Sequence, residues 1–247
     1  MAIVDDAALW GRRFEEMNSL ANAITLEVDA LKKEQPDSVF WKHQDSFRQT
    51  IFAYLSVTST YFKGFDAIFR GVEGVKASDE LRNWVRTVDR HRSVHTIASM
   101  NAAACCSSLE GFLRALIPEW VDQRVVDRVR ASYRRPTRSG APEPLSSKPD
   151  SARKQLDTWL KPSGGAAFAE WLKLVSMAFQ CKFTTPTEVV LEDMIRFRHT
   201  ITHPTELLVD GAIDSPGAER LTCWQHATIS MACTVTSSIV RAERATK

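Results

Sequence analysis

Apolar residues recur every three or four positions along most of this chain, and that spacing limits the fold more than any other feature. The same interval places side chains on one face of an α-helix, because a helix turns once every ~3.6 residues. We find no stretch in which apolar and polar residues alternate between turn-forming residues, as they do in a half-buried strand. The sequence therefore predicts an all-α protein, a bundle of helices around an apolar core.

Length and composition are those of an ordinary globular protein. The 247 residues are 44% hydrophobic and 25% charged, which suffices for one large domain or for a domain with a substantial extension. The sequence has no apolar run of about eighteen residues and no signal peptide. We therefore expect a cytoplasmic protein with no membrane partner.

Prolines, glycines and serines divide the helical pattern into segments. Residues 136–150 hold four prolines and three serines, so we expect a long loop, an insertion at about 134–150. Residues 204–216 are expected to be irregular as well. The predicted helices are 5–33, 39–69, 78–117, 120–133, 151–160, 166–181, 186–203 and 217–244.

The five cysteines lack the spacing of a metal site. Cys105 and Cys106 are adjacent, whereas Cys181, Cys223 and Cys233 are isolated within helical patterns. Cysteine is one of the residue types most often buried, and disulfides are rare in reducing compartments. We expect five free, buried thiols.

The predicted 186–203 helix carries charged residues where its apolar face should continue. Thr185 can cap it, Pro186 suits the first helical position, and Glu188 follows three residues after the cap. Its apolar face runs into Arg198, with His199 one position further round. Desolvating a guanidinium costs several kcal/mol, so Arg198 must meet a partner, a cleft or another subunit. The apolar face consists of Val190, Leu191, Met194, Ile195 and Ile201.

His203 is expected at the end of the same helix, because it precedes Pro204 and the residue before a proline avoids helical backbone angles. On an ideal helix Arg198 and His203 point about 140° apart. A turned helix end would bring the imidazole back towards the guanidinium. We therefore expect the two side chains to serve one cleft.

Histidines also lie on the predicted 78–117 helix, where His91 and His95 fall on the apolar face and Glu110 lies beside it. Two helices thus offer histidine pairs at a spacing of four, and a metal site is one alternative. No His-Glu-x-x-His or Glu-x-x-His pattern supports it, so we expect core histidines and no metal. The carboxylates that could complete such a site are Glu110, Glu192 and Asp193.

Arginines gather between residues 124 and 138, where Asp127 is the one acidic residue. Guanidinium groups bind phosphates without reading a base sequence, so this group is a candidate for RNA contacts. A solvated helix face is the alternative. The candidates are Arg124, Arg128, Arg130, Arg134 and Arg135, followed by Arg138.

The segment from Arg198 to His203 resembles the R-x4-H motif of the HEPN superfamily, in which a polar residue such as His199 commonly follows the arginine. Residues 107–113, Ser-Ser-Leu-Glu-Gly-Phe-Leu, look like the Ser-x-Leu-Glu-aromatic pattern of several HEPN groups. The resemblance implies a helical bundle over 91–247. It leaves residues 1–90 as a helical extension for dimerisation, sensing or partner binding.

Many HEPN proteins are metal-independent endoribonucleases, so the resemblance implies that activity and no cofactor. Cleavage at the RNA's own 2′-hydroxyl needs a base, an acid and positive charge on the phosphorane. We assign Arg198 to the phosphate, His203 to proton transfer, and His199 to orientation or a second proton, with Glu110 in support. A guanidinium suits its part because its forked donors match phosphate oxygens.

The family also implies partners. Its composite site usually forms across a homodimer, and its nucleases act in toxin–antitoxin or antiviral systems. We therefore expect RNA, including tRNA, as substrate, and an antitoxin or sensor protein as a regulator. The alternative is a non-catalytic HEPN-like module that binds RNA or a protein.

Overall fold

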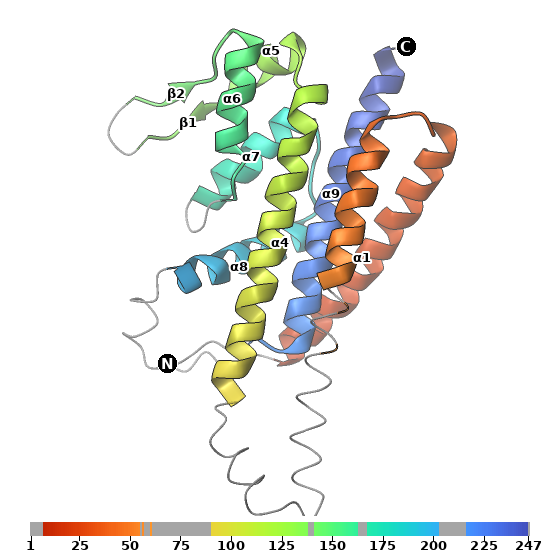
Figure 1. Ribbon diagram of the computed structural model, residues 1–247, viewed down its shortest axis with the longest axis vertical. Coiled ribbons are helices and arrows are strands. Elements are labelled where there is room, and N and C mark those ends of the chain that lie inside the picture. The colour runs from red at the N-terminus through yellow and green to blue at the C-terminus, as the bar shows by residue number, and fades with distance from the viewer. Residues whose placement is uncertain are drawn as a thin grey trace, which may run out of the picture.

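The computed structural model describes residues 7–54, 56, 60, 90–137, 141–162, 167–202 and 216–246, with the backbone alone at residues 7, 90–94, 201–202 and 246. These residues are almost entirely helical, which confirms the all-α prediction (Figure 1). No helix within these ranges combines the length and apolar character needed to cross a bilayer.

Three long helices run along the molecule: α1 (Ala7–Glu34), α4 (Arg90–Trp120) and α9 (Ala218–Thr246) (Figure 1). Both α1 and α4 pack against α9. The helical segment 40–54 lies against the same group, since Gln44 donates to Cys233 of α9 and Phe47 packs on Phe112 of α4. These helices enclose one apolar core.

The helix α9 lies at the centre of the bundle and is buried on nearly all sides. Small side chains allow its neighbours to approach closely. Its hydroxyl groups are accommodated partly by bonds within the helix, since Thr228 donates to Trp224 O at 2.7 Å and Thr236 to Ala232 O at 3.0 Å. A helix with apolar and small residues on every face is stable only when other helices surround it.

The helix α1 follows the predicted spacing, with Met17, Ala21, Val28 and Leu31 all buried. Its outer edge forms ion pairs with the last turns of α9, between Glu27 and Arg241 and between Glu34 and Arg244. Exposed pairs of this kind contribute about 0–1 kcal/mol each. Apolar burial is therefore the main force that holds α1 on α9.

The helix α8 (Thr185–Thr202) crosses α4 and α9. It begins one residue before the predicted start. Glu188 N donates to Thr184 O, and the hydroxyls of Thr184 and Thr187 lie 3.0 Å apart. The predicted helix start is thus confirmed to within one residue, the usual precision of helix limits.

Three shorter helices form the rest of the described bundle: α5 (Gln123–Ser132), α6 (Pro149–Trp159) and α7 (Ala167–Phe179) (Figure 1). The helix α6 packs on α4, α5 packs on α6 and α7, and α7 also contacts α9. The expected loop between α5 and α6 contains a small antiparallel ladder, β1 (Arg134–Arg135) with β2 (Glu143–Pro144). The expectation of no strand is wrong here. Strands of two residues are too short to show any alternation of apolar and polar side chains.

Most helix limits agree with the prediction to within two residues, and two differ by three. The helix α4 continues past Pro118 to Trp120, because a proline so near the end removes only one late backbone bond. The helix α5 begins at Gln123 rather than Trp120, since Asp122 caps it by accepting from Val125 N at 3.0 Å.

The boundary expected near residue 90 adjoins residues 61–89, which lie outside the described part. On either side of it the chain contributes to one core. Met17 and Val28 of α1 belong to the same buried cluster as Leu109 of α4 and Trp224 of α9. Residues 7–54 are thus packed into the bundle along their length.

Candidate functional site

Arg198 lies on the face of α8 that is otherwise buried. Val190, Leu191, Met194 and Ile195 are at most 2% exposed, and Arg198 continues their face in a half-buried position. The sequence prediction that this face runs into Arg198 is therefore confirmed. Apolar packing of the preceding turns fixes where its backbone lies.

Two groups contact the Arg198 guanidinium. Nη1 lies 3.5 Å from the carbonyl oxygen of Pro162, just after α6. Cys106 of α4 is within hydrogen-bond reach, and burial raises the pKa of its thiol to about 12 although the charge of Arg198 acts to lower it. Glu110 acts on the same thiol in the raising direction. Arg198 is thus held between α4, α8 and the segment that follows α6.

Glu110, the predicted supporting residue, belongs to an ion-pair chain, and its role at the site stays a prediction. Its carboxylate is 3.3 Å from Arg114, which binds Asp157 of α6 through two nitrogens at 2.6 and 2.8 Å. The Glu110 side chain is 20% exposed. This chain fixes α6, and therefore Pro162, relative to α4.

His199 is exposed on α8 beside Arg198. His203 lies outside the described residues, so the expected approach of Arg198 and His203 stays a prediction. Arg196 is exposed and lies 3.5 Å from Glu192, the ordinary helix pair its spacing of four indicates.

Sequence reasoning missed an ion pair at Asp193, five residues before Arg198. Asp193 accepts from Arg220 of α9 at 2.8 and 2.9 Å and from Trp224 Nε1 at 2.8 Å. Phe197 packs on Trp224 and on His95, with ring centroids 5.0 and 5.5 Å apart. A signal was present, because Arg220 precedes the buried Trp224 by four residues and so shares its face.

The histidines and carboxylates considered as metal ligands have other neighbours. Glu192 meets Arg196, Asp193 meets Arg220, and His95 lies edge-on to Phe197. Within the described ranges, no three His, Cys, Asp or Glu side chains are grouped so that they could hold a metal ion. The side chain of His91 and all of His203 lie outside those ranges.

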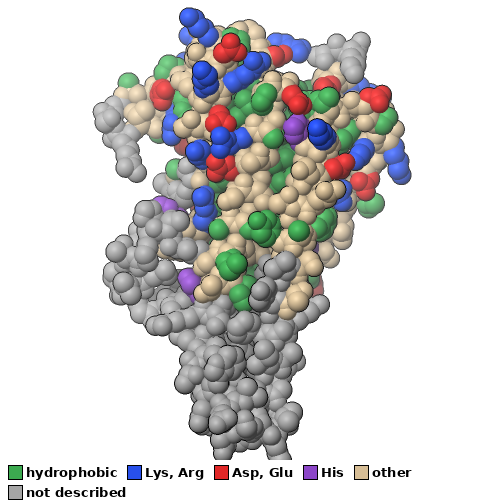
Figure 2. Space-filling model, viewed as in Figure 1, with side chains coloured by type: hydrophobic (Ala, Val, Ile, Leu, Met, Phe, Trp, Pro, Cys, Tyr) green, Lys and Arg blue, Asp and Glu red, His purple; other side chains and the backbone are tan. Residues whose placement is uncertain are grey.

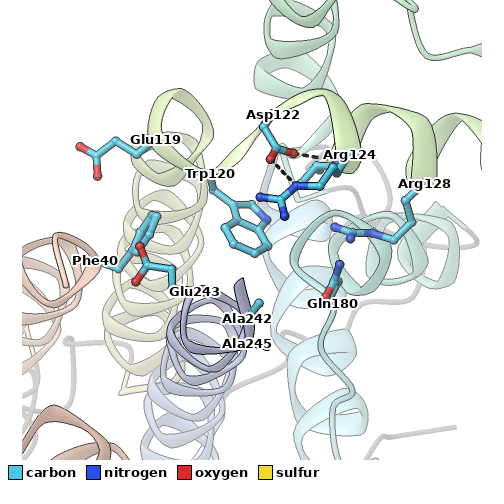
Figure 3. Close-up of a pocket in the computed structure, with 11 residues that line it drawn as sticks. Phe40, Glu119, Trp120, Asp122, Arg124, Arg128, Gln180, Ala242, Glu243 and Ala245 are labelled. Carbon is cyan, nitrogen blue, oxygen red and sulfur yellow. Dashed lines mark hydrogen bonds and ion pairs between the residues drawn. The ribbon is translucent and has the colours of Figure 1, made fainter. Parts of the chain in front are cut away.

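The predicted arginine group is divided between two hollows. Arg124 and Arg128 line a pocket with Trp120 and Glu243 (Figure 3). Arg130 and Arg134 line another hollow, beside Asp127. On the face in Figure 2, blue Lys and Arg side chains lie among red Asp and Glu side chains. Arg138 lies outside the described residues.

Several of these arginines make structural contacts. Arg128 donates from Nε to Met177 O at 3.0 Å and from Nη2 to Ala178 O at 3.2 Å, and so satisfies carbonyls at the end of α7. Arg134 donates to the carbonyl oxygen of Tyr133 at 2.9 Å. Arg135 lies over the Trp159 ring at 5.6 Å. Their role in RNA binding stays a prediction.

All five cysteines are free and buried, as the sequence predicted. Burial raises the pKa of Cys181 and Cys223 to about 12 and that of Cys233 to about 11. Thiols with such pKa values are protonated near neutral pH and make poor nucleophiles.

Comparison of the chain with protein-family models, with curated proteins and with solved structures found no match.

Proposed function

We propose that this protein is a HEPN-type endoribonuclease that cleaves RNA without a metal ion, in a toxin–antitoxin or antiviral setting. The observation that carries the proposal is the position of Arg198, a half-buried guanidinium on the apolar face of α8. His199 is exposed beside it and the helix leads directly to His203. The R-x4-H spacing supplies the link to the family.

The proposed reaction uses the RNA as its own nucleophile. The 2′-hydroxyl gives its proton to a base while its oxygen attacks phosphorus, and the bond from phosphorus to the 5′-oxygen breaks as that oxygen takes a proton. The products are a 2′,3′-cyclic phosphate and a 5′-hydroxyl end. His203 moves the protons, and Arg198 stabilises the charge on the phosphorane.

Surrounding groups prepare Arg198 for this role. The Pro162 carbonyl and Cys106 hold the guanidinium, which lowers the entropy lost when it binds a phosphate. The Glu110 carboxylate, which acts on Cys106, lies 3.3 Å from Arg114. In the proposed homodimer a second copy of the chain places another Arg198 and His203 opposite the first pair, so we expect a dimer in solution.

The test is cleavage of total RNA or tRNA in EDTA by the wild type, Arg198→Ala and His203→Ala. We expect each variant to lose about a hundred-fold or more in rate. Arg196→Ala is the matched control, because Arg196 lies on the same helix and its side chain is 63% exposed. A wild type that cuts nothing, or variants that cut as fast as it does, would contradict the proposal.

A non-catalytic module that binds RNA or a protein is the second candidate. The contact between Arg198 and the Pro162 carbonyl favours it, since a guanidinium committed to protein groups is a structural element. In that case Arg198→Ala would lower the thermal midpoint without affecting any cleavage. Gel-shift titration with tRNA would then show binding with no product.

A further inference from the structure

One pocket opens where five separate segments meet, and it lies apart from Arg198. Its volume is about 460 Å³. Cys106, beside Arg198, precedes Trp120, in the pocket, by fourteen residues of α4, so helix rise alone separates them by about 20 Å. The lining comes from the helical segment 40–54, the end of α4, α5, the residue after α7, and the end of α9.

One half of the pocket is basic. Arg124 and Arg128 lie one turn apart on α5, and Gln180 lies beside Arg128 (Figure 3). Burial lowers the pKa of Arg128, Asp122 acts to raise it, and the charge of Arg124 lowers it further. The two guanidiniums therefore repel each other, and an anion between them would relieve that repulsion.

The guanidiniums differ in how firmly they are fixed. Arg128 donates to the carbonyls of Met177 and Ala178, so its positive charge has a fixed position at the pocket. Arg124 is 72% exposed and touches Asp122 through Nε at 2.9 Å. That contact leaves the outer nitrogens of Arg124 able to move towards a ligand.

The other half is aromatic and acidic. The Trp120 ring stands in the middle of the pocket, and Phe40 meets it edge-on with centroids 6.3 Å apart (Figure 3). Glu243 lies beside Phe40 and accepts from Ser38 Oγ at 2.8 Å. Glu119 lies at the rim, 3.2 Å from His43. Carboxylates next to aromatic rings are a favourable environment for an organic cation.

We propose that this pocket binds a small zwitterion, with its ammonium group near Trp120 and Glu243 and its carboxylate or phosphate between Arg124 and Arg128. Three carboxylates and two guanidiniums line the pocket, so neither a lone anion nor a lone cation matches both halves. The Trp120 indole is fixed, because Nε1 donates to Ala178 O at 2.8 Å. The site is therefore largely formed before a ligand arrives.

Isothermal titration calorimetry with the full chain tests the proposal. The probes are γ-aminobutyrate and O-phosphoethanolamine, which distinguish a carboxylate from a phosphate as the anionic end. Ethanolamine, a cation, and inorganic phosphate, an anion, are the controls that carry charge of one sign only. We expect at least one zwitterion to bind about tenfold or more tighter than either control, because each control leaves one charged half unpaired.

Variants locate the site. Arg124→Ala should weaken the affinity for the zwitterion about tenfold or more, because the anionic end loses a guanidinium. Glu243→Gln should also weaken the affinity, because the ammonium end loses a carboxylate. Arg130→Ala is the matched control on the same helix and should bind as the wild type does. The proposal is overturned if no zwitterion binds at millimolar concentration, if inorganic phosphate binds equally well, or if Arg124→Ala has no effect. Ribonuclease assays on Glu243→Gln, which lies outside the predicted RNA-contact group, keep this result separate from the proposed activity: the variant should lose zwitterion binding and keep the wild-type cleavage rate.

Discussion

Arg220 and Asp193 form a two-pronged ion pair between α9 and α8, with Nε 2.9 Å from Oδ2 and Nη2 2.8 Å from Oδ1. Their side chains are 9% and 19% exposed. The guanidinium also faces the rings of Trp10, Phe197 and Trp224, at 5.2, 5.8 and 5.5 Å. One arginine thus joins α1, α8 and α9, through an aspartate five residues before Arg198.

Asp193→Asn should destabilise the protein strongly, because it leaves the Arg220 charge buried without its carboxylate. Loss of one partner of a buried pair costs about 3–5 kcal/mol, and we expect the lower end because the asparagine oxygen can still accept one bond. Urea unfolding followed by circular dichroism measures the change. Glu192→Gln is the neighbouring control, since Glu192 is 46% exposed, and it should shift the free energy by under about 0.5 kcal/mol.

That destabilisation is also a test of the pair itself. If Asp193→Asn unfolds at the same urea concentration as the wild type, the pair contributes no net stability. The surrounding rings would then be what holds Arg220 in place.

The position of Arg198 could be predicted from the sequence, whereas its partners could not. Helical spacing is a local property, and it correctly places Arg198 on the face of Leu191 and Met194. The contacts with Pro162 and Cys106 depend on how α4, α6 and α8 pack, and local spacing carries no information about that. For the same reason, Arg220 is visible as a charge on an apolar face while Asp193 is not identifiable as its partner.

The pocket at Trp120 illustrates a second limit. The sequence places Arg124 and Arg128 in a basic cluster, but Phe40 and Glu243 come from distant helices. A pocket built from five segments has no motif of its own. Only the packing of the helix ends shows that the basic group faces acidic and aromatic side chains.

Alkaline pH should destabilise the fold through its buried thiols. Burial raises the pKa of Cys106 to about 12 and that of Cys233 to about 11, and unfolding returns each to about 8.5. The folded state holds more protons above pH 8.5, so stability is intact below that value and is lost as pH rises towards 11. The slope is up to about 1.4 kcal/mol per pH unit for each thiol.

Urea midpoints at pH 7.5, 9 and 10 measure this loss, and Cys181→Ala should remove one thiol's share of the slope. A midpoint that stays constant up to pH 10 contradicts the expectation. In the folded protein at pH 8, an aromatic disulfide reagent should react slowly with all five cysteines, because each is buried.

Acidic pH should destabilise the folded protein by protonating His226 of α9. Burial lowers the pKa of this imidazole, which stacks on Phe14 with centroids 6.2 Å apart, and within the described part of the chain its buried Nδ1 has no hydrogen-bond partner. The pKa of His226 is lower in the folded state than the unfolded-state value of about 6.5. The neutral imidazole therefore contributes stability above pH 6.5, and that stability is lost as the pH falls through the folded-state pKa. Unfolding free energies at pH 7 and 5 should therefore differ less for His226→Phe than for the wild type.

Gln180 should be replaceable by glycine with a gain in stability. It ends α7 with a φ of 54°, the left-handed conformation that costs a residue with a side chain about 1 kcal/mol. Cys181 N donates to Ser176 O at 3.1 Å, which completes the Schellman arrangement that favours glycine at position 180. Because the Gln180 side chain is exposed, its removal opens no cavity. Gln180→Gly should raise the free energy of unfolding by about 0.5–1 kcal/mol. Gln180→Ala is the control and should not raise it, because alanine keeps the steric cost of the left-handed conformation. Equal effects of the two substitutions would mean that side-chain contacts, and not backbone strain, decide the stability.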